Sequence, residues 1–311
     1  MNAPPGARTR NAVARFDNHP RAGFALGLAA YGVWGILPIY FEAIRAVPAV
    51  DIVAHRVLWS LPFLALLVAV GGGREKVRAA VRRPETIGML FVTALLIGAN
   101  WLLYVYAVTS GHILASSFGY YLNPIVNVLL GRFVLREKLT KAQWAAVAIA
   151  AAGILVLAAG ALTQLWLSLS LCFTFALYGL LRKIVRADAL TGLAIETAIL
   201  FPLAIAWLGW MLAASQPIFG SSSRDVGLLL LAGVISTTPL LLFTGAARRL
   251  PYSTLGMLQF ISPTLQFLIA VLIYRERVTV AHMIAFPAIW AALVLYVMSM
   301  RRAPKLPQAP E

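Results

Sequence analysis

The sequence predicts an all-α integral membrane protein of ten transmembrane helices, arranged as two inverted five-helix repeats. Three observations predict this fold. The 311 residues are 61% hydrophobic and only 12% charged, whereas a soluble domain is about 45–50% apolar and about 25% charged. The apolar residues gather in runs long enough to span a bilayer, which takes roughly 20 residues of helix. One motif also occurs twice, once in each half of the chain.

Ten apolar runs are candidate spans. They contain Gly and Pro too freely, and alternate too rarely, for the strands of a transmembrane barrel. Each run instead has the length of a membrane helix. We therefore expect helices at about 22–44, 49–70, 87–109, 113–134, 142–160, 164–181, 191–214, 226–247, 252–273 and 281–300.

The doubled motif covers residues 123–140 and 262–279, which align without a gap. Each copy has a proline, an apolar run, an Arg-Glu pair and a threonine: Pro124, Arg136, Glu137 and Thr140, then Pro263, Arg275, Glu276 and Thr279. Repeated helix sets with an interrupted helix at corresponding places are typical of secondary transporters. Since five is odd, the two halves must insert with opposite topology, about a pseudo-two-fold axis in the membrane plane.

The basic residues set the predicted orientation. The net charge is +15, and an even number of spans puts both termini on one side. With the termini in the cytoplasm, 21 of the 26 Lys and Arg residues fall in or beside cytoplasmic segments. This bias is the positive-inside rule, so the charge favours a bilayer over the minor alternative of nucleic acid as the partner.

The chain accordingly divides into four parts. We expect a cytoplasmic N-terminal tail at 1–20, a first repeat at 21–161, a second repeat at 162–300 and a cytoplasmic C-terminal tail at 301–311. The first apolar run is too long for a signal-peptide core, and we interpret it as an uncleaved anchor. The single cysteine, Cys172, allows no disulfide within the chain.

Polar and aromatic residues at membrane depth are the candidate binding residues. Tyr120, Asn123 and Asn127 share one helix face, and a matching stripe recurs on the ninth span. Two such stripes from inverted helices predict a central cavity for a neutral or zwitterionic solute. The alternative is hydrogen bonding between helices, worth about 0.6 kcal/mol each. The candidates are Trp34, Asn100, Tyr104, Tyr120, Asn123, Asn127, Tyr178, Gln259, Ser262 and Gln266.

His55, Arg56 and Glu196 are ionisable residues that lie well inside the predicted spans, away from the span ends. A charge at the bilayer centre costs at least about 2.5–3.5 kcal/mol on insertion scales, so we assign these residues a gating or proton-coupling role. The alternative is structural ion pairing, of Glu196 with Arg182 or Lys183 and of Arg56 with Asp51 or Glu42.

Pro124 and Pro263 are predicted helix breaks. A proline inside a helix removes one backbone hydrogen bond and clashes with the preceding turn. The break then either forms a hinge facing the substrate or shapes helix packing.

Signatures of enzymes are missing from the sequence. The four histidines and Cys172 have no metal-ligand spacing, and there is no P-loop for ATP, so we expect neither a metal nor a cofactor. Small-residue pairs such as Gly23 and Gly27 allow close helix approach. They are compatible with a monomer or a homodimer.

The chain resembles the EamA-type permeases of the drug/metabolite transporter superfamily, and its first half resembles the RarD group most. The resemblance covers about 22–300. It rests on Tyr-Gly-Val-Trp-Gly, Ala-His-Arg, Asn-Trp, Gly-Tyr-Tyr-Leu-Asn-Pro and Gln-Trp in the first half, and Ala-Leu-Tyr-Gly-Leu-Leu-Arg-Lys and Leu-Thr-Gly in the second, at 31–35, 54–56, 100–101, 119–124, 143–144, 176–183 and 190–192. It implies ten helices and a multi-pass permease of the bacterial inner membrane that exports small metabolites. The family labels no binding residues on this chain.

These observations predict a secondary permease that moves a small organic metabolite or drug by alternating access, with export favoured. Two rival interpretations remain open. An integral-membrane enzyme acting on a lipid-like substrate would need carboxylates or metal ligands clustered at one interface. A structural or regulatory membrane subunit would leave the two matched polar stripes unexplained.

Overall fold

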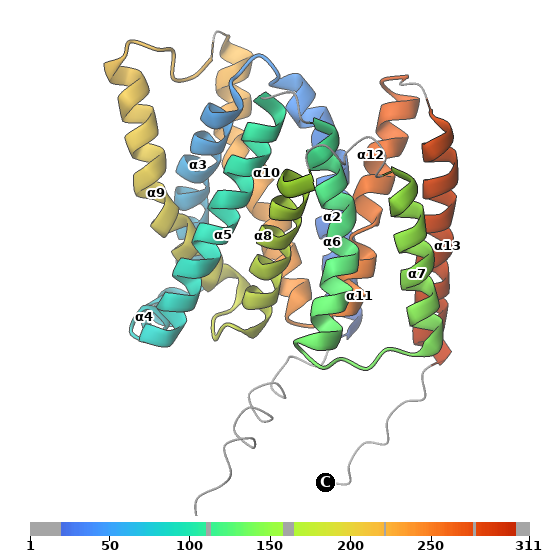
Figure 1. Cartoon of the computed structure of the whole chain (residues 1–311). Helices are drawn as coiled ribbons and strands as arrows, with labels where there is room; N and C mark the ends of the chain where they lie inside the picture. The colour runs from blue at the N-terminus through green and yellow to red at the C-terminus, as the bar shows by residue number, and fades with distance from the viewer. Residues whose placement is uncertain (1–19, 110–112, 158–164, 221, 276–277, 303–311) are drawn as a thin grey trace, which may run out of the picture.

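The computed structural model describes residues 20–109, 113–157, 165–220, 222–275 and 278–302, and these form helices without a strand (Figure 1). The helices are α2 (Pro20–Ala43), α3 (Ala49–Val70), α4 (Arg74–Val81), α5 (Pro84–Thr109), α6 (Ile113–Phe133), α7 (Lys141–Leu157), α8 (Leu165–Ile184), α9 (Ala189–Ala213), α10 (Ser223–Ala247), α11 (Tyr252–Leu258), α12 (Ile261–Leu272) and α13 (Val280–Arg302).

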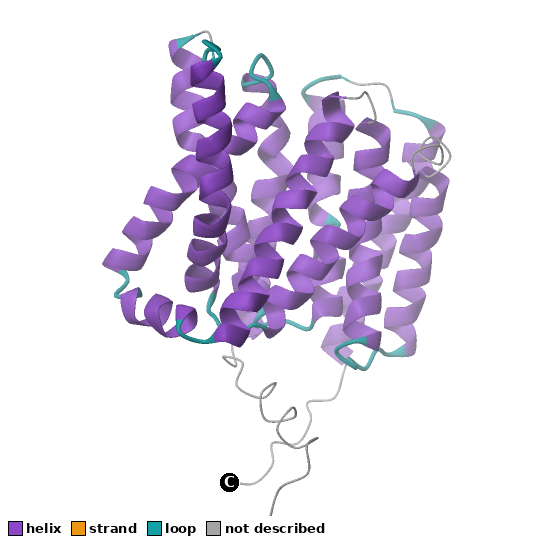
Figure 2. Cartoon of the chain, turned by 60° about the vertical axis from the view of Figure 1, so that its left-hand side comes forward, coloured by secondary structure: helices purple, strands orange, loops and turns teal. Residues whose placement is uncertain are grey.

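The long helices run side by side as one bundle, with the short α4 lying across its lower end (Figure 2). Helix contacts occur in pairs that exchange the two halves of the chain. α6 packs on α8 as α12 packs on α2, and α10 packs on α2 as α5 packs on α8. Three contacts, α7 with α13, α3 with α9 and α6 with α11, join equivalent helices of the two halves. This is the packing that an inverted repeat requires.

Eight helices of the described ranges are long and apolar enough to cross a membrane, with α11 and α12 together forming one of them. α7 is apolar but shorter, and α6 occupies the predicted span 113–134. The membrane fold predicted from the sequence is therefore confirmed, while the total of ten crossings stays a prediction. The predicted helix bounds differ from the observed ones by up to a few residues, because helix ends depend on local capping.

The two copies of the doubled motif end their helices in the same way. Two successive N–H groups donate to one carbonyl at 2.9 and 3.2 Å: Val134 and Leu135 to Leu130 in α6, Ile273 and Tyr274 to Ile269 in α12. The next residue is left-handed in both copies, with φ of 57° at Arg136 and 54° at Arg275. A positive φ is uncommon for arginine, so its recurrence shows that the sequence repeat is also a structural one.

The following helices begin with the same cap. Thr140 and Gln143 bond each other's backbone N–H before α7, and Thr279 and His282 do so before α13. Reciprocal bonds of this kind form a capping box. α7 begins at the lower end of the bundle and α13 at the upper end (Figure 1), so the two copies point in opposite directions.

The predicted helix break occurs in only one copy. The ninth span is interrupted at Gln259 and Phe260, between α11 and α12. Gln259 stands four residues before Pro263, where the proline removes the hydrogen bond and crowds the carbonyl. α6 continues through Pro124 without interruption, which corrects the expectation of matching breaks. One missing bond does not end a helix whose neighbouring turns remain bonded.

The basic stretch between α3 and α5 contains α4. Val77 and Ala80 are three residues apart and so share one face of α4. Ala80 is buried, and Val77 packs with it against the start of α5 and the loop before α9. A short amphipathic helix of this kind lies along an interface rather than through a membrane.

Membrane topology gives the first testable prediction. In a background with Cys172→Ser, we expect Lys141→Cys and Val280→Cys to react with an impermeant thiol reagent from opposite sides, because α7 and α13 start at opposite ends of the bundle. With both termini cytoplasmic, the position-280 variant is labelled in intact cells and the position-141 variant only after lysis. Labelling of both in intact cells would contradict the inverted repeat.

Candidate functional site

Arg56 occupies the upper half of the bundle, on α3. Its Nε–H donates to Ser236 Oγ of α10 at 2.7 Å. Its guanidinium carbon lies 4.6 Å from the centre of the Trp101 ring of α5, which is cation–π geometry. The side chain is half-buried. Arg56 thus joins helices of both halves of the chain.

Close contact between α3 and α10 sets this geometry. Gly233 of α10 lies against the backbone of Trp59 and Ser60, where a Cβ would collide with main-chain atoms. Ser60 Oγ is 2.5 Å from the Arg56 carbonyl and 3.2 Å from that of Gly233, and Thr237 Oγ1 donates to Ser60 Oγ at 2.7 Å. These contacts fix Ser236 opposite Arg56.

Three of the predicted site residues gather beside Arg56. Tyr120 of α6 donates to the side-chain oxygen of Asn100 at 3.3 Å, and its ring centre lies 6.0 Å from that of Tyr104. Asn100 is buried, and its amide donates to Leu171 O and Thr174 Oγ1 of α8 at 2.9 and 3.0 Å. We call Arg56, Trp101, Tyr104 and Tyr120 the upper cluster.

The other predicted polar residues lie between α6 and the ninth span. Asn127 donates to Gln259 Oε1 at 2.9 Å, and both side chains are buried. Asn123 is also fully buried, and its amide has no partner among the described residues. Gln266 is exposed and donates to Ser262 Oγ and to the carbonyl of Trp34, both at 3.2 Å. The predicted stripe therefore divides: Tyr120 faces Asn100, while Asn127 faces Gln259.

Aromatic rings fill the space below the upper cluster. The rings of Tyr31, Trp34, Phe175, Tyr178 and Phe243 have neighbouring centres between 5.4 and 6.4 Å apart. These rings belong to α2, α8 and α10, and four of them are fully or largely buried. We call these five rings the aromatic cluster. Stacking at such distances stabilises packed side chains beyond their buried area.

Glu196 lies deeper still, in a sealed ionic network. Arg182 Nε is 3.4 Å from its Oε1, and the two side chains are 0% and 1% exposed. Thr93 donates to Glu196 at 2.5 Å, and the Tyr178 hydroxyl lies 3.4 Å away. Pairing of Glu196 with Arg182 is thereby confirmed. Gly192 makes room for the pair, because a Cβ there would collide with the guanidinium.

The lower ends of the helices are tied by cations and carbonyls. Lys183 donates to the carbonyls of Ala247 and Leu250 at the end of α10. Arg248 donates back to the carbonyls of Val185 and Ala187, at 3.0 and 2.7 Å. Basic groups at helix C-termini satisfy carbonyls that the helix leaves unpaired. These bonds close the bundle on the side where α2 begins and α13 ends.

His55 holds a loop at the upper end. The Trp59 indole N–H, which can only donate, bonds His55 Nδ1 at 3.2 Å. Nδ1 therefore carries no proton, and Nε2–H donates to the carbonyl of Ile218 at 2.8 Å. The ring is a neutral tautomer that fastens the loop between α9 and α10 to α3, with Phe219 packed 5.0 Å away.

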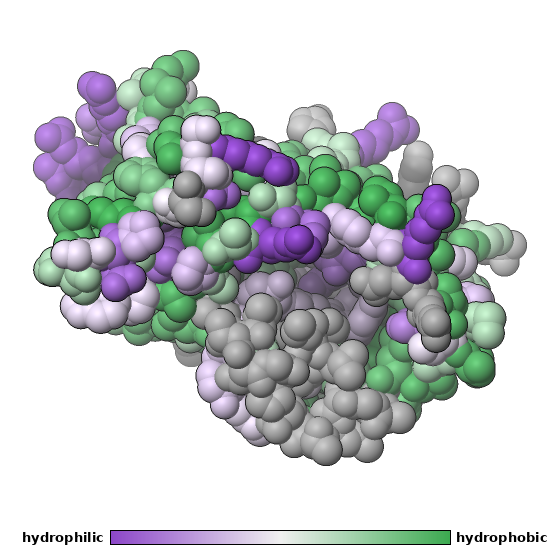
Figure 3. Space-filling view, turned by 90° about the horizontal axis from the view of Figure 1, so that it is seen from above, coloured by the Kyte–Doolittle hydropathy of each residue, from purple (hydrophilic) through white to green (hydrophobic). Residues whose placement is uncertain are grey.

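The upper and lower faces of the bundle differ. Seen from above, hydrophilic atoms lie around a shaded hollow near the middle of the upper face (Figure 3). The upper cluster lies in the halves of α3, α5 and α6 nearest to this face. The Arg182–Glu196 pair lies in the halves of α8 and α9 nearest to the lower face, and the aromatic cluster lies between this pair and the upper cluster.

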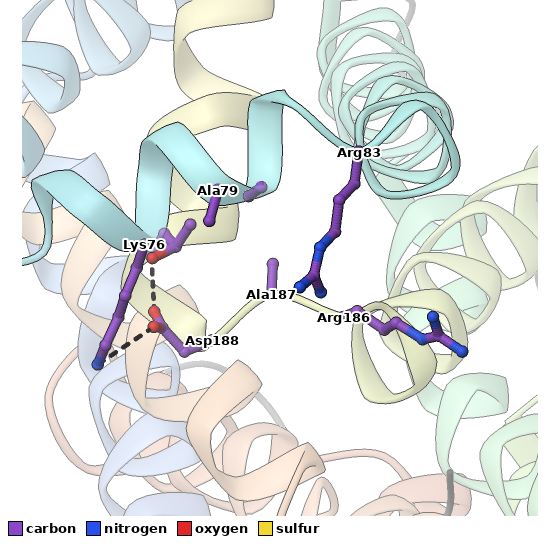
Figure 4. Close-up of a pocket in the computed structure, with 8 residues that line it drawn as sticks. Lys76, Ala79, Arg83, Arg186, Ala187 and Asp188 are labelled. Carbon is purple, nitrogen blue, oxygen red and sulfur yellow. Dashed lines mark hydrogen bonds and ion pairs between the residues drawn. The ribbon is translucent and has the colours of Figure 1, made fainter.

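A pocket of about 190 Å³ opens at the lower face, away from the predicted site (Figure 4). α4 and the loop before α9 form it, and Lys76 reaches Asp188 at 3.7 Å. Arg83 and Arg186 add two further basic side chains to its lining, beside alanines and Thr191. Apart from the basic charge of 71–86, nothing in the sequence predicts this pocket.

Several contributors were missed from the sequence. Trp101, Ser236, Thr93 and Thr174 are not among the residues that the sequence predicted for the site. Ser236 belongs to the run Ser-Thr-Thr in an apolar span, which is a usable signal for a polar contact. The others are single threonines whose partners lie far away in sequence. Across the described ranges, no three His, Cys, Asp or Glu side chains come together to hold a metal.

Comparison with known proteins agrees with the fold and adds a family. Residues 21–159 match the sequence model of the EamA-like transporter family. An uncharacterised transporter of Vibrio cholerae is 44% identical over 277 residues, covering 89% of this chain and 92% of its own. Protein RarD of Escherichia coli is 43% identical over 286 residues, covering 89% and 94%. A solved crystal structure, 19% identical, superposes with a TM-score of 0.70 over 90% of this chain and 99% of its own.

Proposed function

Because the chain belongs to the EamA family of the drug/metabolite transporter superfamily, as a RarD-type permease, we propose that it is a secondary permease working by alternating access. The family makes it a multi-pass membrane transporter. We propose further that it moves a small organic metabolite or drug, with export favoured, in the bacterial inner membrane with both termini cytoplasmic.

The observation that carries this proposal is the upper cluster. Its residues come from α3, α5 and α6 of the first half and meet Ser236 of the second half. They are half-buried polar and aromatic side chains at membrane depth. In transporters built from inverted repeats, the substrate binds between the halves near the midplane. Asn100, Tyr104 and Tyr120 are the predicted binding residues that best fit this position.

The difference between the two faces supports alternating access. The upper cluster lies in the helix halves nearest to the upper face, and that face is hollowed near its middle (Figure 3). On the lower side the aromatic cluster, the Arg182–Glu196 pair and the Lys183 and Arg248 ties close the bundle. With cytoplasmic termini, this conformation is closed towards the cytoplasm. Transport then requires the lower contacts to open as the upper ones close.

The proposed role of the remaining candidates follows from their places. Gln259, next to the interruption of the ninth span, and its partner Asn127 lie where the two halves meet. His55 fastens the upper loop, which suits a gate. Glu196 is sealed from water in this conformation, so proton binding would need the lower side to open.

Flux into reconstituted vesicles tests the proposal. Proteoliposomes loaded with a cell extract of small metabolites are incubated with and without a pH gradient, and mass spectrometry follows each compound inside and outside. We expect protein-dependent movement of a few organic solutes without ATP. Protein-free vesicles are the control. Covalent turnover of a lipid in the same vesicles, with no solute moved, would instead support the membrane-enzyme alternative.

A further inference from the structure

We infer that Arg56 is the anchor for a carboxylate of the transported solute, whose apolar part rests on the rings of the upper cluster. The inference rests on the proposed function and adds a substrate class to it. The sequence predicted a neutral or zwitterionic solute. The inferred substrate class keeps the zwitterions that carry a carboxylate and adds monoanionic carboxylates.

The charge of Arg56 is not balanced by any carboxylate of the described residues. Ser236 Oγ accepts one of its five N–H donors. Within the described residues no carboxylate lies within ion-pair distance of it. The two predicted partners are engaged elsewhere. Asp51 accepts from the Trp207 indole at 2.9 Å, and Glu42 pairs with Arg45 at 2.8 Å. The expected pairing of Arg56 is therefore wrong.

Arg182, which is buried among the helices, differs from Arg56 in having an ion-pair partner. That arginine has a carboxylate at 3.4 Å and is sealed with it. Charges within membrane spans are normally paired or face a water-filled cavity, since an isolated charge there is costly. Arg56 has a structural partner for its Nε–H only, and its terminal nitrogens are not among the enclosed atoms of the described residues that lack a partner. They are therefore not fully enclosed, and their N–H groups are free to bond a ligand that enters beside the Trp101 ring.

The side chains around the Arg56 guanidinium are uncharged and mostly aromatic. Trp101 covers one face of the guanidinium, and Tyr40, Tyr104 and Tyr120 lie close enough to act on its charge electrostatically. None of these groups is an anion at neutral pH. A planar guanidinium with free N–H groups matches the two oxygens of a carboxylate. One guanidinium balances one negative charge, so a carboxylate fits better than a phosphate dianion.

Arg56 and the neighbouring rings are preorganised for binding. The bond to Ser236 and the Trp101 ring hold Arg56 in place before a solute arrives. The Tyr104 and Tyr120 rings, 6.0 Å apart, are held through Asn100 by α8. Holding the binding groups in advance reduces the ordering cost of binding. Rings beside a fixed cation are suited to an acid with an apolar body.

The test compares acids with their own amides. The purified full-length protein is titrated with benzoate and benzamide, phenylacetate and phenylacetamide, and N-acetylphenylalanine and its amide, and binding is read from the rise in melting temperature. We expect each acid to bind about tenfold to a hundredfold more tightly than its amide, as for hydrogen bonds to charged groups. Phenylphosphonate is included to separate carboxylate from phosphate-like anions, and we expect it to bind more weakly than benzoate.

Variants assign the preference to Arg56. Arg56→Gln should remove the preference for acids, and Arg56→Lys should keep part of it, because the charge remains but the planar fork is lost. Arg45→Gln is the matched control, since Arg45 is exposed and pairs only with Glu42 among the described residues. If Arg56→Gln does not fold, the wild-type and Arg56→Lys titrations still decide the question.

Four outcomes would overturn the inference: amides that bind as tightly as acids, an acid preference that survives Arg56→Gln, phenylphosphonate binding more tightly than benzoate, or no acid binding below about 10 mM. The flux assay separates this from the proposed function. Protein-dependent movement of solutes that lack a carboxylate would sink the inference and leave the transport proposal standing. Acid binding without any flux would support the carboxylate site and contradict the transport proposal.

Discussion

Arg182→Met is expected to destabilise the protein by about 3–5 kcal/mol, because removal of one partner leaves the other charge buried without compensation. The Glu196 carboxylate would keep only the Thr93 hydroxyl, at 2.5 Å, and the distant Tyr178 hydroxyl. Gly192→Ala should act in the same direction, because its Cβ would displace the guanidinium from the carboxylate. Reversible unfolding of the detergent-purified protein gives the measurement.

Two controls separate the buried pair from charge loss in general. Arg45→Met removes a pair that is 77% and 48% exposed, and exposed pairs are worth about 0–1 kcal/mol. The double variant Arg182→Met with Glu196→Met should be more stable than Arg182→Met, because both buried charges are gone. A double variant no more stable than the single one would show that the pair is not the source of the effect.

The same pair decides between the two interpretations of Glu196. Glu196→Gln keeps the shape and the hydrogen bond from Thr93 but removes the charge. Some loss of stability is expected in either case, because Arg182 loses its carboxylate. If Glu196 carries a transported proton, the folded protein that remains also loses the dependence of flux on the pH gradient. Unchanged flux with unchanged pH dependence would leave Glu196 as a structural partner of Arg182.

Gly233→Ala is expected to prevent stable folding or to reduce it sharply, by at least the upper end of the about 1–3 kcal/mol typical of overpacking. The new Cβ would meet the backbone of Trp59 and Ser60, and a backbone cannot rotate away as a side chain can. α3 and α10 would have to separate, which would also pull Ser236 from Arg56. Yield of monodisperse protein and melting temperature are the measurements.

Gly227→Ala on the same helix is the matched control. A Cβ at Gly227 meets nothing within 4 Å, so we expect wild-type behaviour or a slight gain from the better helix propensity of alanine. The ordering of the two variants is the prediction. Equal stability of Gly233→Ala and Gly227→Ala would mean that α3 and α10 are not in the close contact described.

The sequence alone does not distinguish Gly233 from Gly227. Each is a single glycine in an apolar run, and nothing local distinguishes Gly233 from Gly227. The difference arises only from the helix that packs against one of them. The same holds for Gly192 and Gly209 on α9, where a Cβ would collide with Arg182 at the first and meet nothing at the second.

Helix breaks show a similar limit. Six prolines lie inside continuous helices: Pro38, Pro62, Pro124, Pro202, Pro239 and Pro287. Among the spans that the structure describes, only the one with Pro263 is interrupted. A proline weakens one bond of a helix. Whether the helix then opens depends on what neighbouring helices offer the freed groups, and Asn127 of α6 meets Gln259 at the interruption.

The sequence by itself determined the membrane class, the helical fold, the doubled motif and its opposite orientation, because these follow from hydrophobic run length, charge placement and local hydrogen bonding. The matching left-handed Arg136 and Arg275 and the two threonine caps are local consequences of that kind. It also identified Asn100, Tyr104 and Tyr120 as polar and aromatic residues at membrane depth. Tertiary structure alone decided their partners: Glu196 with Arg182, and Arg56 with Ser236 and Trp101 rather than with a carboxylate. The physical reason is that pairing depends on how helices distant in sequence rotate and pack against each other, which no local pattern encodes.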